Sequence, residues 1–170
     1  LPLCDRGEII STNVEGTRML LHTASARGIG RFVHVSSTAV YGIPDHHPLV
    51  ENDRLVGVGP YGESKVLAER ECEEARAGGL CLTVLRPKSF VGPERLGAFE
   101  LLYDFAADGH NFPVLGSGRN RYQLLDVDDL NAAVLLAATA GAEVANDTYN
   151  VGAVRFGSLR DSFQAVLDRA

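Results

Sequence analysis

The sequence predicts an α/β fold in which helices alternate with buried parallel strands, and two observations support this prediction. Helical patterns alternate along the chain with short runs of apolar and β-branched residues. These runs are mostly apolar and do not alternate with polar residues, as expected of strands that are covered on both faces. Strands separated by helices in this way form parallel layers with right-handed crossovers. A chain of 170 residues is long enough to bury one core of this kind.

The first half of the chain is predicted to contain two helices and two strands. The first helix gathers its apolar residues on one face, with Ser11 or Thr12 as its cap. The second begins near Pro60, which suits a first helical turn, and a Gly-Gly pair stops it. In order, we expect a helix over 8–28, a strand over 31–37, a long loop over 38–60, a helix over 60–79 and a strand over 80–87.

The second half alternates in the same way. A helix ended by Gly109 precedes two short extended pieces around a glycine-rich turn. Acidic residues at the start of the next helical pattern suit a first turn. In order, we expect a helix over 94–109, extended pieces within 112–130, a helix over 127–142, a strand over 147–153 and a helix over 158–170.

The composition argues against several classes of function. A net charge of −6 is unlike a surface for nucleic acid or anionic membrane, because such surfaces need basic patches. No apolar run approaches the ~18 residues of a membrane span, and the first residues lack the apolar segment of a signal peptide. Three widely spaced cysteines favour spare thiols in a reducing compartment. We therefore expect a cytoplasmic protein without nucleic-acid or membrane partners.

The stretch GVGPYGESK, residues 57–65, allows two interpretations. Its glycines spell G-x-G-x-x-G, the fingerprint of a dinucleotide-binding turn. Such a turn must follow a strand directly, whereas the preceding ENDRLV is polar, and Pro60 offers no N–H to a phosphate. The second interpretation is that Tyr61 and Lys65 form an acid–base pair, since residues four apart share one face of a helix. The sequence favours this second interpretation.

A lysine beside a tyrosine has a chemical consequence. A free tyrosine has a pKa of about 10 and is a poor base at neutral pH. A nearby ammonium group stabilises the phenolate, which gives a usable proton acceptor or donor. On spacing alone, a solvated helix start with an exposed Lys65 explains the pattern equally well.

Two polar clusters are candidates for metal binding or acid–base catalysis. The run DHH at 45–47 lies in a loop without other suitably spaced ligands, which is typical of solvated residues. The acids of DVDDL at 126–130 stand where capping and the helix dipole favour them. We therefore predict no metal site.

Longer segments carry a resemblance to a known family. RFVHVSSTAVYG at 31–42, PYGESKVLAE at 60–69 and LTVLRPKSFVGP at 82–93 occur in the order that the family has. Together with NVEGTRMLL at 13–21 and RYQLLDVDDLNAA at 121–133, they make the chain similar to the extended short-chain dehydrogenase/reductases, or NAD-dependent epimerase/dehydratases. The resemblance implies a Rossmann-like parallel sheet with helices on both faces.

By this resemblance the chain is an enzyme that uses NAD or NADP. Tyr61 is the expected catalytic acid/base, and Lys65 supports it and binds the nicotinamide ribose. Ser37 falls on the catalytic serine position and would hydrogen-bond the reacting oxygen of the substrate. These three residues are also expected to contact the cofactor. The further expected cofactor contacts are Asn13, Pro87 and Lys88.

The expected substrate contacts depend on two departures from the family. Epimerases of nucleotide sugars tend to have asparagine where Ser89 stands, and often an arginine for the diphosphate where Tyr122 stands. Arginines flank that second position, and a guanidinium group binds phosphate well. The expected substrate contacts are Thr38, Ser89, Arg119 and Arg121.

The expected reaction moves a hydride between the nicotinamide and a carbon that bears a hydroxyl or carbonyl group. A nucleotide sugar is the expected substrate, in an epimerase or a dehydratase, and a homodimer is the expected assembly. RPKSFVGP is also compatible with relatives that act on sterols or small carbonyls. A dinucleotide-binding scaffold without catalysis is the alternative from another class, because fold alone does not establish function.

The resemblance also implies a division of the chain. The family opens with a strand, a glycine turn and a helix that this sequence does not contain. We therefore expect the middle, or the ordered part, of a longer protein, with the C-terminal half of the sheet and part of a small substrate lobe. Residues 1–92 would form the Rossmann half with the catalytic residues. Residues 93–170 would be mostly the substrate lobe, with about 121–140 returning to the Rossmann domain.

Overall fold

The computed structural model of the chain describes residues 5–93, 100–110, 114 and 116–168. The chain divides into two compact units. Unit 1 comprises Leu1–Pro87 and Asn131–Val151, and unit 2 comprises Lys88–Leu130 and Gly152–Ala170. Within the described ranges, no helix combines the length and the apolar character needed to cross a bilayer.

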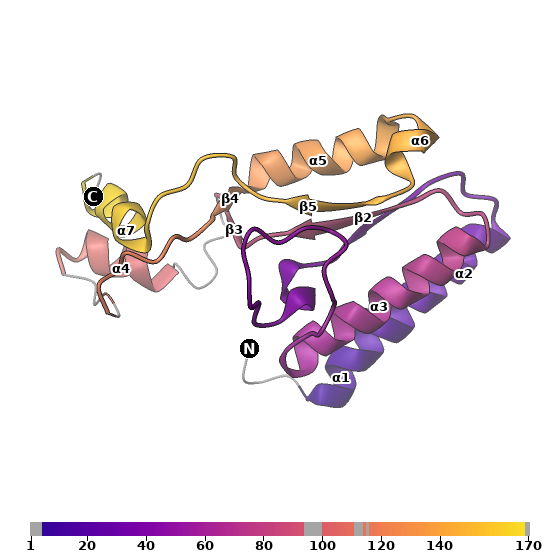
Figure 1. Cartoon of the computed structure of the whole chain (residues 1–170), viewed down its shortest axis with the longest axis horizontal. Coiled ribbons are helices and arrows are strands. Elements are labelled where there is room, and N and C mark those ends of the chain that lie inside the picture. Colours follow the sequence, from indigo (N-terminus) through magenta and orange to yellow (C-terminus); the bar gives the residue numbers. More distant parts are fainter. Residues whose placement is uncertain (1–4, 94–99, 111–113, 115, 169–170) are drawn as a thin grey trace. The chain divides into compact units, whose positions relative to one another are not determined.

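Unit 1 is built on a three-stranded parallel sheet in the order β1–β2–β5 (Figure 1). The central strand β2 (Leu82–Pro87) pairs with β1 (Phe32–Val35) on one side and with β5 (Thr148–Val151) on the other. The register places Arg86 opposite Asn150. All six residues of β2 are buried, which explains why this run is so apolar. The predicted parallel sheet is confirmed.

Helices cover both faces of this sheet. Helices α2 (Gly16–Ala26) and α3 (Gly59–Ala77) pack against one another on one face, and the unit 1 part of α5 (Val127–Thr139) lies on the other (Figure 1). Arg31, just before β1, donates hydrogen bonds to the carbonyls of Ala137 and Ala140 at the end of α5. A short helix, α6 (Ala142–Ala145), precedes β5 and was not predicted.

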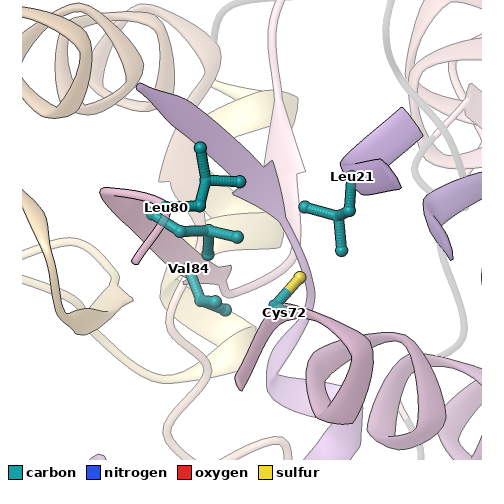
Figure 2. Close-up of a cluster of buried hydrophobic side chains, with 5 residues drawn as sticks. Leu21, Cys72, Leu80 and Val84 are labelled. Carbon is teal, nitrogen blue, oxygen red and sulfur yellow. The ribbon is translucent and has the colours of Figure 1, made fainter. Parts of the chain in front are cut away.

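The core of unit 1 lies between the sheet and the pair α2 and α3. Leu21 and Cys72 come from these two helices, and Leu80, Leu82 and Val84 come from β2 and the turn before it (Figure 2). Cys72 is fully buried, and this burial raises the pKa of its thiol to about 12. A thiol that stays protonated is a poor nucleophile, so Cys72 acts here as a small apolar residue.

The N-terminal helical segment contains a π turn. Helix α1 (Arg6–Ile10) passes directly into η1 (Ser11–Glu15), which has π-helical hydrogen bonds, and then into α2. The side chain of Asp5 caps the segment by accepting a hydrogen bond from the N–H two residues later, at 2.9 Å. The predicted caps, Ser11 and Thr12, are wrong, because both lie inside the π turn rather than at the helix start.

The described part of unit 2 includes a two-stranded parallel pair, the helices α4 (Glu100–Ala107) and α7 (Leu159–Leu167), and the first turn of α5. Strand β3 (Phe90–Val91) pairs with β4 (Leu125–Asp126), and α4 contacts α7. Ser158 caps α7, as part of a complete capping box. Strand β3 was not predicted. The first predicted extended piece, and the start of the helix expected at 94, lie outside the described residues.

Candidate functional site

Ser37 stands where β1 gives way to a short 3-10 turn, η2 (Thr38–Tyr41). Its Oγ accepts a hydrogen bond from the N–H of Ala39 at 3.2 Å and so caps the turn. The hydroxyl proton of Ser37 is not used in this bond. Ser36 is buried, and its Oγ has no hydrogen-bond partner among the described residues. A capping serine at the carboxyl end of a parallel strand stands where α/β folds place their ligands.

Helix α3 carries Tyr61 and Lys65 in its first two turns. The side chain of Tyr61 is 44% exposed, and the ammonium of Lys65 lies 6.0 Å from the centre of its ring. The same ammonium donates a hydrogen bond to the carbonyl of Val35, the last residue of β1, at 3.1 Å. Lys65 therefore ties the start of α3 to the end of the strand that leads into Ser37.

The charge of Lys65 shapes the electrostatics of this region. Burial lowers the pKa of the Lys65 ammonium, whereas the carboxylate of Glu69, one turn further along α3, acts in the opposite direction. On β1, burial and then the charge of Lys65 lower the pKa of His34 to about 4. His34 is therefore neutral at pH 7, and its Nε2 lies buried with no hydrogen-bond partner in the described part of the chain.

Asn13 reaches α3 from the π turn. Its amide Nδ2 donates a hydrogen bond to Ser64 Oγ at 2.9 Å, and Ser64 Oγ donates in turn to the carbonyl of Tyr61 at 2.7 Å. Asn13 is thus linked to the backbone of the candidate acid/base. π turns inside helices frequently occur at functional sites. Cofactor binding by Asn13 stays a prediction.

The glycines of GVGPYG have a packing role. Gly57 has a φ of +64°, and a Cβ built there would lie 2.8 Å from backbone atoms of Gly62 and Glu63. A Cβ on Gly62 would approach the carbonyl of Ala39 to 3.0 Å. Close contact between the loop, η2 and the first turn of α3 therefore requires glycine at these positions. This geometry explains the glycines without a bound phosphate and favours the acid–base interpretation of the stretch.

The residues expected to bind substrate in the second half of the chain belong to unit 2. Tyr122 donates a hydrogen bond from its hydroxyl to Ser89 Oγ at 2.9 Å, and the ammonium of Lys88 lies 5.7 Å from the centre of its ring. The guanidinium of Arg121 stacks on Phe156 at 4.4 Å. Lys88, Ser89 and Tyr122 therefore form one cluster, which Arg121 does not join.

The other predicted residues are placed as follows. Arg119 is exposed in the glycine-rich turn, where its N–H meets the hydroxyl of Ser117 at 3.4 Å. Thr38 opens η2 and is half-buried. Pro87 ends β2 in unit 1 and is buried. The roles expected of these residues stay predictions.

Sequence reasoning missed a buried ion pair in unit 1. Arg86 of β2 and Glu69 of α3 have side chains that are 4% and 3% exposed, and Arg86 Nη2 lies 2.6 Å from Glu69 Oε2. Burial alone would lower the pKa of the Arg86 guanidinium, but its hydrogen bond to Glu69 and the charge of that carboxylate raise the pKa above its ordinary value. An arginine inside the apolar run LTVLRP was the available signal, because a buried charge must find a partner.

The two polar clusters considered in the sequence have structural roles. His46 hydrogen-bonds Asp45 at 2.7 Å and Asp53 at 3.2 Å, and these contacts raise the pKa of the exposed His46. Asp126 accepts a hydrogen bond from the N–H of Asp128 at the start of α5, at 2.9 Å. Among the described residues, no group of three or more His, Cys, Asp or Glu side chains is arranged to hold a metal ion.

Two known proteins are similar to this chain over nearly its whole length. An uncharacterized protein, y4nG of Sinorhizobium fredii, is 35% identical over 172 residues that cover 100% of this chain and 43% of that protein. A dTDP-glucose 4,6-dehydratase of Streptomyces antibioticus is 33% identical over 165 residues, which cover 95% of this chain and 49% of that enzyme. The chain thus spans about half the length of the curated relatives it matches.

A solved structure extends the likeness to three dimensions. The DesIV double mutant, a dTDP-glucose 4,6-dehydratase from Streptomyces venezuelae with NAD and DAU bound, superposes with a TM-score of 0.81 at 30% identity. The match covers 96% of this chain and 51% of that one. The sequence profile of the NAD dependent epimerase/dehydratase family matches residues 4–152. The chain with its parallel sheet, capped Ser37 and adjoining Tyr61 and Lys65 belongs to the NAD dependent epimerase/dehydratase family.

Proposed function

We propose that this chain forms the catalytic part of an NAD-dependent enzyme that acts on a nucleotide sugar, as an epimerase or a dehydratase. One observation carries the proposal: the ammonium of Lys65 lies beside the ring of Tyr61 and is bonded to the strand end that leads to Ser37. The names of the relatives, dTDP-glucose 4,6-dehydratases among them, support the substrate class.

The residues of unit 1 fit the nicotinamide-ribose end of NAD. An ammonium group has three N–H donors, and only one of those of Lys65 is used within the described chain, on Val35. The remaining donors suit the ribose hydroxyls. Tyr61 is 44% exposed, so a ligand can reach its side chain. When bound, NAD supplies the hydride acceptor and donor, which no side chain provides.

The proposed mechanism assigns one task to each side chain. Ser37 donates its hydroxyl proton in a hydrogen bond to the reacting oxygen and orients it. With NAD bound as hydride acceptor, the Tyr61 phenolate would take the proton of the substrate hydroxyl, so that a carbonyl could form at that carbon. Lys65 stabilises the phenolate before this step. Reduction of the carbonyl reverses both transfers.

The cluster of Lys88, Ser89 and Tyr122 favours a second candidate, a dehydrogenase or reductase of sterols or small carbonyls. Where epimerases of nucleotide sugars tend to have asparagine and arginine, this chain has the hydrogen-bonded pair Ser89 and Tyr122. The two hydroxyl groups of this pair carry no positive charge that could bind a diphosphate. Lys88, the cation of the cluster, is expected to contact the cofactor instead of the substrate.

We also propose that the protein is a homodimer and is located in the cytoplasm. Helices α2 and α3 expose Met19 at 66%, Leu20 at 58% and Leu67 at 36%, which supports an apolar contact with a second copy. The free thiols of Cys72 and Cys81 are consistent with a reducing compartment.

The decisive experiment is a substrate screen with the complete protein and NAD. We expect the protein to convert dTDP-glucose, UDP-glucose or UDP-glucuronic acid. NMR spectra of the products would identify the reaction. Turnover of sterols or small carbonyls alone would favour the second candidate. NAD binding without turnover of either group would favour a scaffold without catalysis.

A further inference from the structure

Arg86 contacts three of the segments that surround the candidate catalytic residues of unit 1. Its Nε donates to both carboxylate oxygens of Glu69 on α3, at 3.0 and 3.1 Å, and its Nη2 donates to Oε2 at 2.6 Å. Its Nη1 donates to the hydroxyl of Tyr41 in η2 and to the carbonyl of Glu51 in the following loop, both at 2.8 Å. One buried guanidinium thus joins β2 to α3, to η2 and to the loop.

The contact with Glu69 fixes the part of α3 that carries Tyr61 and Lys65. Tyr61, Lys65 and Glu69 follow one another at intervals of four residues, so they share one face of the helix. The forked contact at Glu69 fixes the rotation of α3 about its axis against β2. The direction in which Tyr61 and Lys65 point depends on that rotation.

The contact with Tyr41 fixes the turn that begins at Ser37. Tyr41 is the last residue of η2, and its hydroxyl accepts from Arg86 and donates to Asn150 Oδ1 in β5, at 2.7 Å. The N–H of Asn150 in turn donates to the carboxylate of Glu51 at 2.7 Å. Each end of η2 is therefore held by a hydrogen bond, and the end at Tyr41 is buried.

We propose that Arg86 is a positioning residue, which holds Tyr61 and Lys65 on α3 in register with Ser37 on η2. This inference rests on the proposed function, because it assigns the three side chains to one reaction. Arg86 is 4% exposed, and its guanidinium is bonded to Glu69, Tyr41 and the carbonyl of Glu51. Its effect on the reaction is exerted through Glu69 and Tyr41.

The test uses small changes at the two partners of Arg86. Arg86→Met would leave Glu69 buried without its partner, and the chain is then expected to unfold. Tyr41→Phe removes a single hydroxyl, and Glu69→Gln removes the charge but keeps an amide oxygen that still accepts a hydrogen bond from Arg86. Val84→Ala, two residues before Arg86 in β2, is the matched control, because it loses core packing and no polar contact.

In the complete protein, we expect Tyr41→Phe and Glu69→Gln to lower kcat about tenfold or more, since small misplacements of reacting groups are costly. KM should change by less than about twofold. Val84→Ala should lower Tm but leave kcat near the wild-type value. If the two partner variants behave like Val84→Ala, Arg86 is merely structural and the positioning role is refuted.

A second readout does not depend on turnover. NMR of ¹³C-labelled lysine follows Lys65, whose signal is assigned by its absence from the spectrum of Lys65→Arg. Glu69→Gln should shift the amide signal of Ser37, and Tyr41→Phe, which removes no charge, should shift the Lys65 signal. Both effects are expected because each changed residue lies on the other side of Arg86 from the group observed. Unchanged signals in both variants would also refute the positioning role. Absence of nucleotide-sugar turnover in the wild type would refute the proposed function instead, and the NMR signals would still decide the role of Arg86.

Discussion

The hydroxyl of Tyr61 is the atom on which the proposed chemistry depends. Tyr61→Phe should lower turnover by a factor of about a hundred or more, the usual contribution of a positioned acid or base. NAD affinity should change little, because the ring is retained. Steady-state kinetics and calorimetric titration of NAD measure the two effects. Full activity of Tyr61→Phe would contradict the assigned role.

The two arginines of unit 2 are expected to differ. Arg121 is held by its stacking on Phe156 and by a hydrogen bond to the carbonyl of that residue at 3.3 Å, whereas Arg119 is exposed in a turn. We therefore predict that Arg119→Ala raises KM for a nucleotide sugar more than Arg121→Ala does. In Arg119→Ala the free energy of substrate binding should become less favourable by about 1.5–3 kcal/mol, as for the loss of a charged hydrogen bond. Equal, negligible effects would favour the sterol or small-carbonyl candidate.

His34 makes the stability of the chain sensitive to acid. The pKa of His34 is lowered from 6.5 to about 4 in the folded chain, so the unfolded chain takes up a proton first as the pH falls. Stability is therefore lost progressively between about pH 6.5 and pH 4, at up to about 1.4 kcal/mol per pH unit. His34→Leu, which removes the buried imidazole, should flatten this dependence. Urea unfolding at pH 7.5, 6 and 5 tests it, and an identical slope in both proteins would refute the role of His34.

At the scale of elements, the contact between the loop and α3 is the most sensitive to substitution. Gly57 and Gly59 both have positive φ angles, but only at Gly57 would a Cβ meet backbone atoms. Gly57→Ala should therefore lower the free energy of unfolding by about 1–3 kcal/mol more than Gly59→Ala does. Gly59→Ala introduces the backbone strain of a positive φ angle but no clash. Denaturant unfolding of the two variants measures the difference. Equal losses would show that the loop can move away from α3.

The elements that could be predicted are those with a local signal. The α3 helix follows from Pro60 in its first turn and the Gly-Gly pair at its end, and strands β1 and β2 follow from mostly apolar runs. Strand β3 has only two residues, too few for a pattern. The partner of Arg86 is 17 residues away and that of Asn13 is 51 residues away, so both contacts depend on tertiary structure. Local sequence patterns therefore could not predict the buried network around Arg86.

At the scale of the whole molecule, the exposed apolar residues of α2 and α3 predict self-association. Leu20→Glu should convert the expected homodimer to a monomer, because it places a charge in an apolar contact. Ser25→Glu is the control, since Ser25 is exposed on the same helix and is not apolar. Size-exclusion chromatography with light scattering gives the mass of each variant. A monomeric wild type, or a Leu20→Glu variant that stays dimeric, would rule out this surface.

The π turn at Ser11–Glu15 sets the helical phase between the two ends of the N-terminal segment. On one side of it Arg6 forms an ion pair with Glu63 at 2.8 Å, and within it Asn13 bonds Ser64. Loss of one codon in this turn, such as that of Thr12, would allow an uninterrupted α-helix to form. Because a π turn holds one residue more than an α turn, the residues on either side of the deletion would keep nearly the same orientation relative to one another. A reading-frame-preserving deletion here would therefore keep the helix and the Arg6 ion pair, and would change the position of Asn13 relative to Ser64.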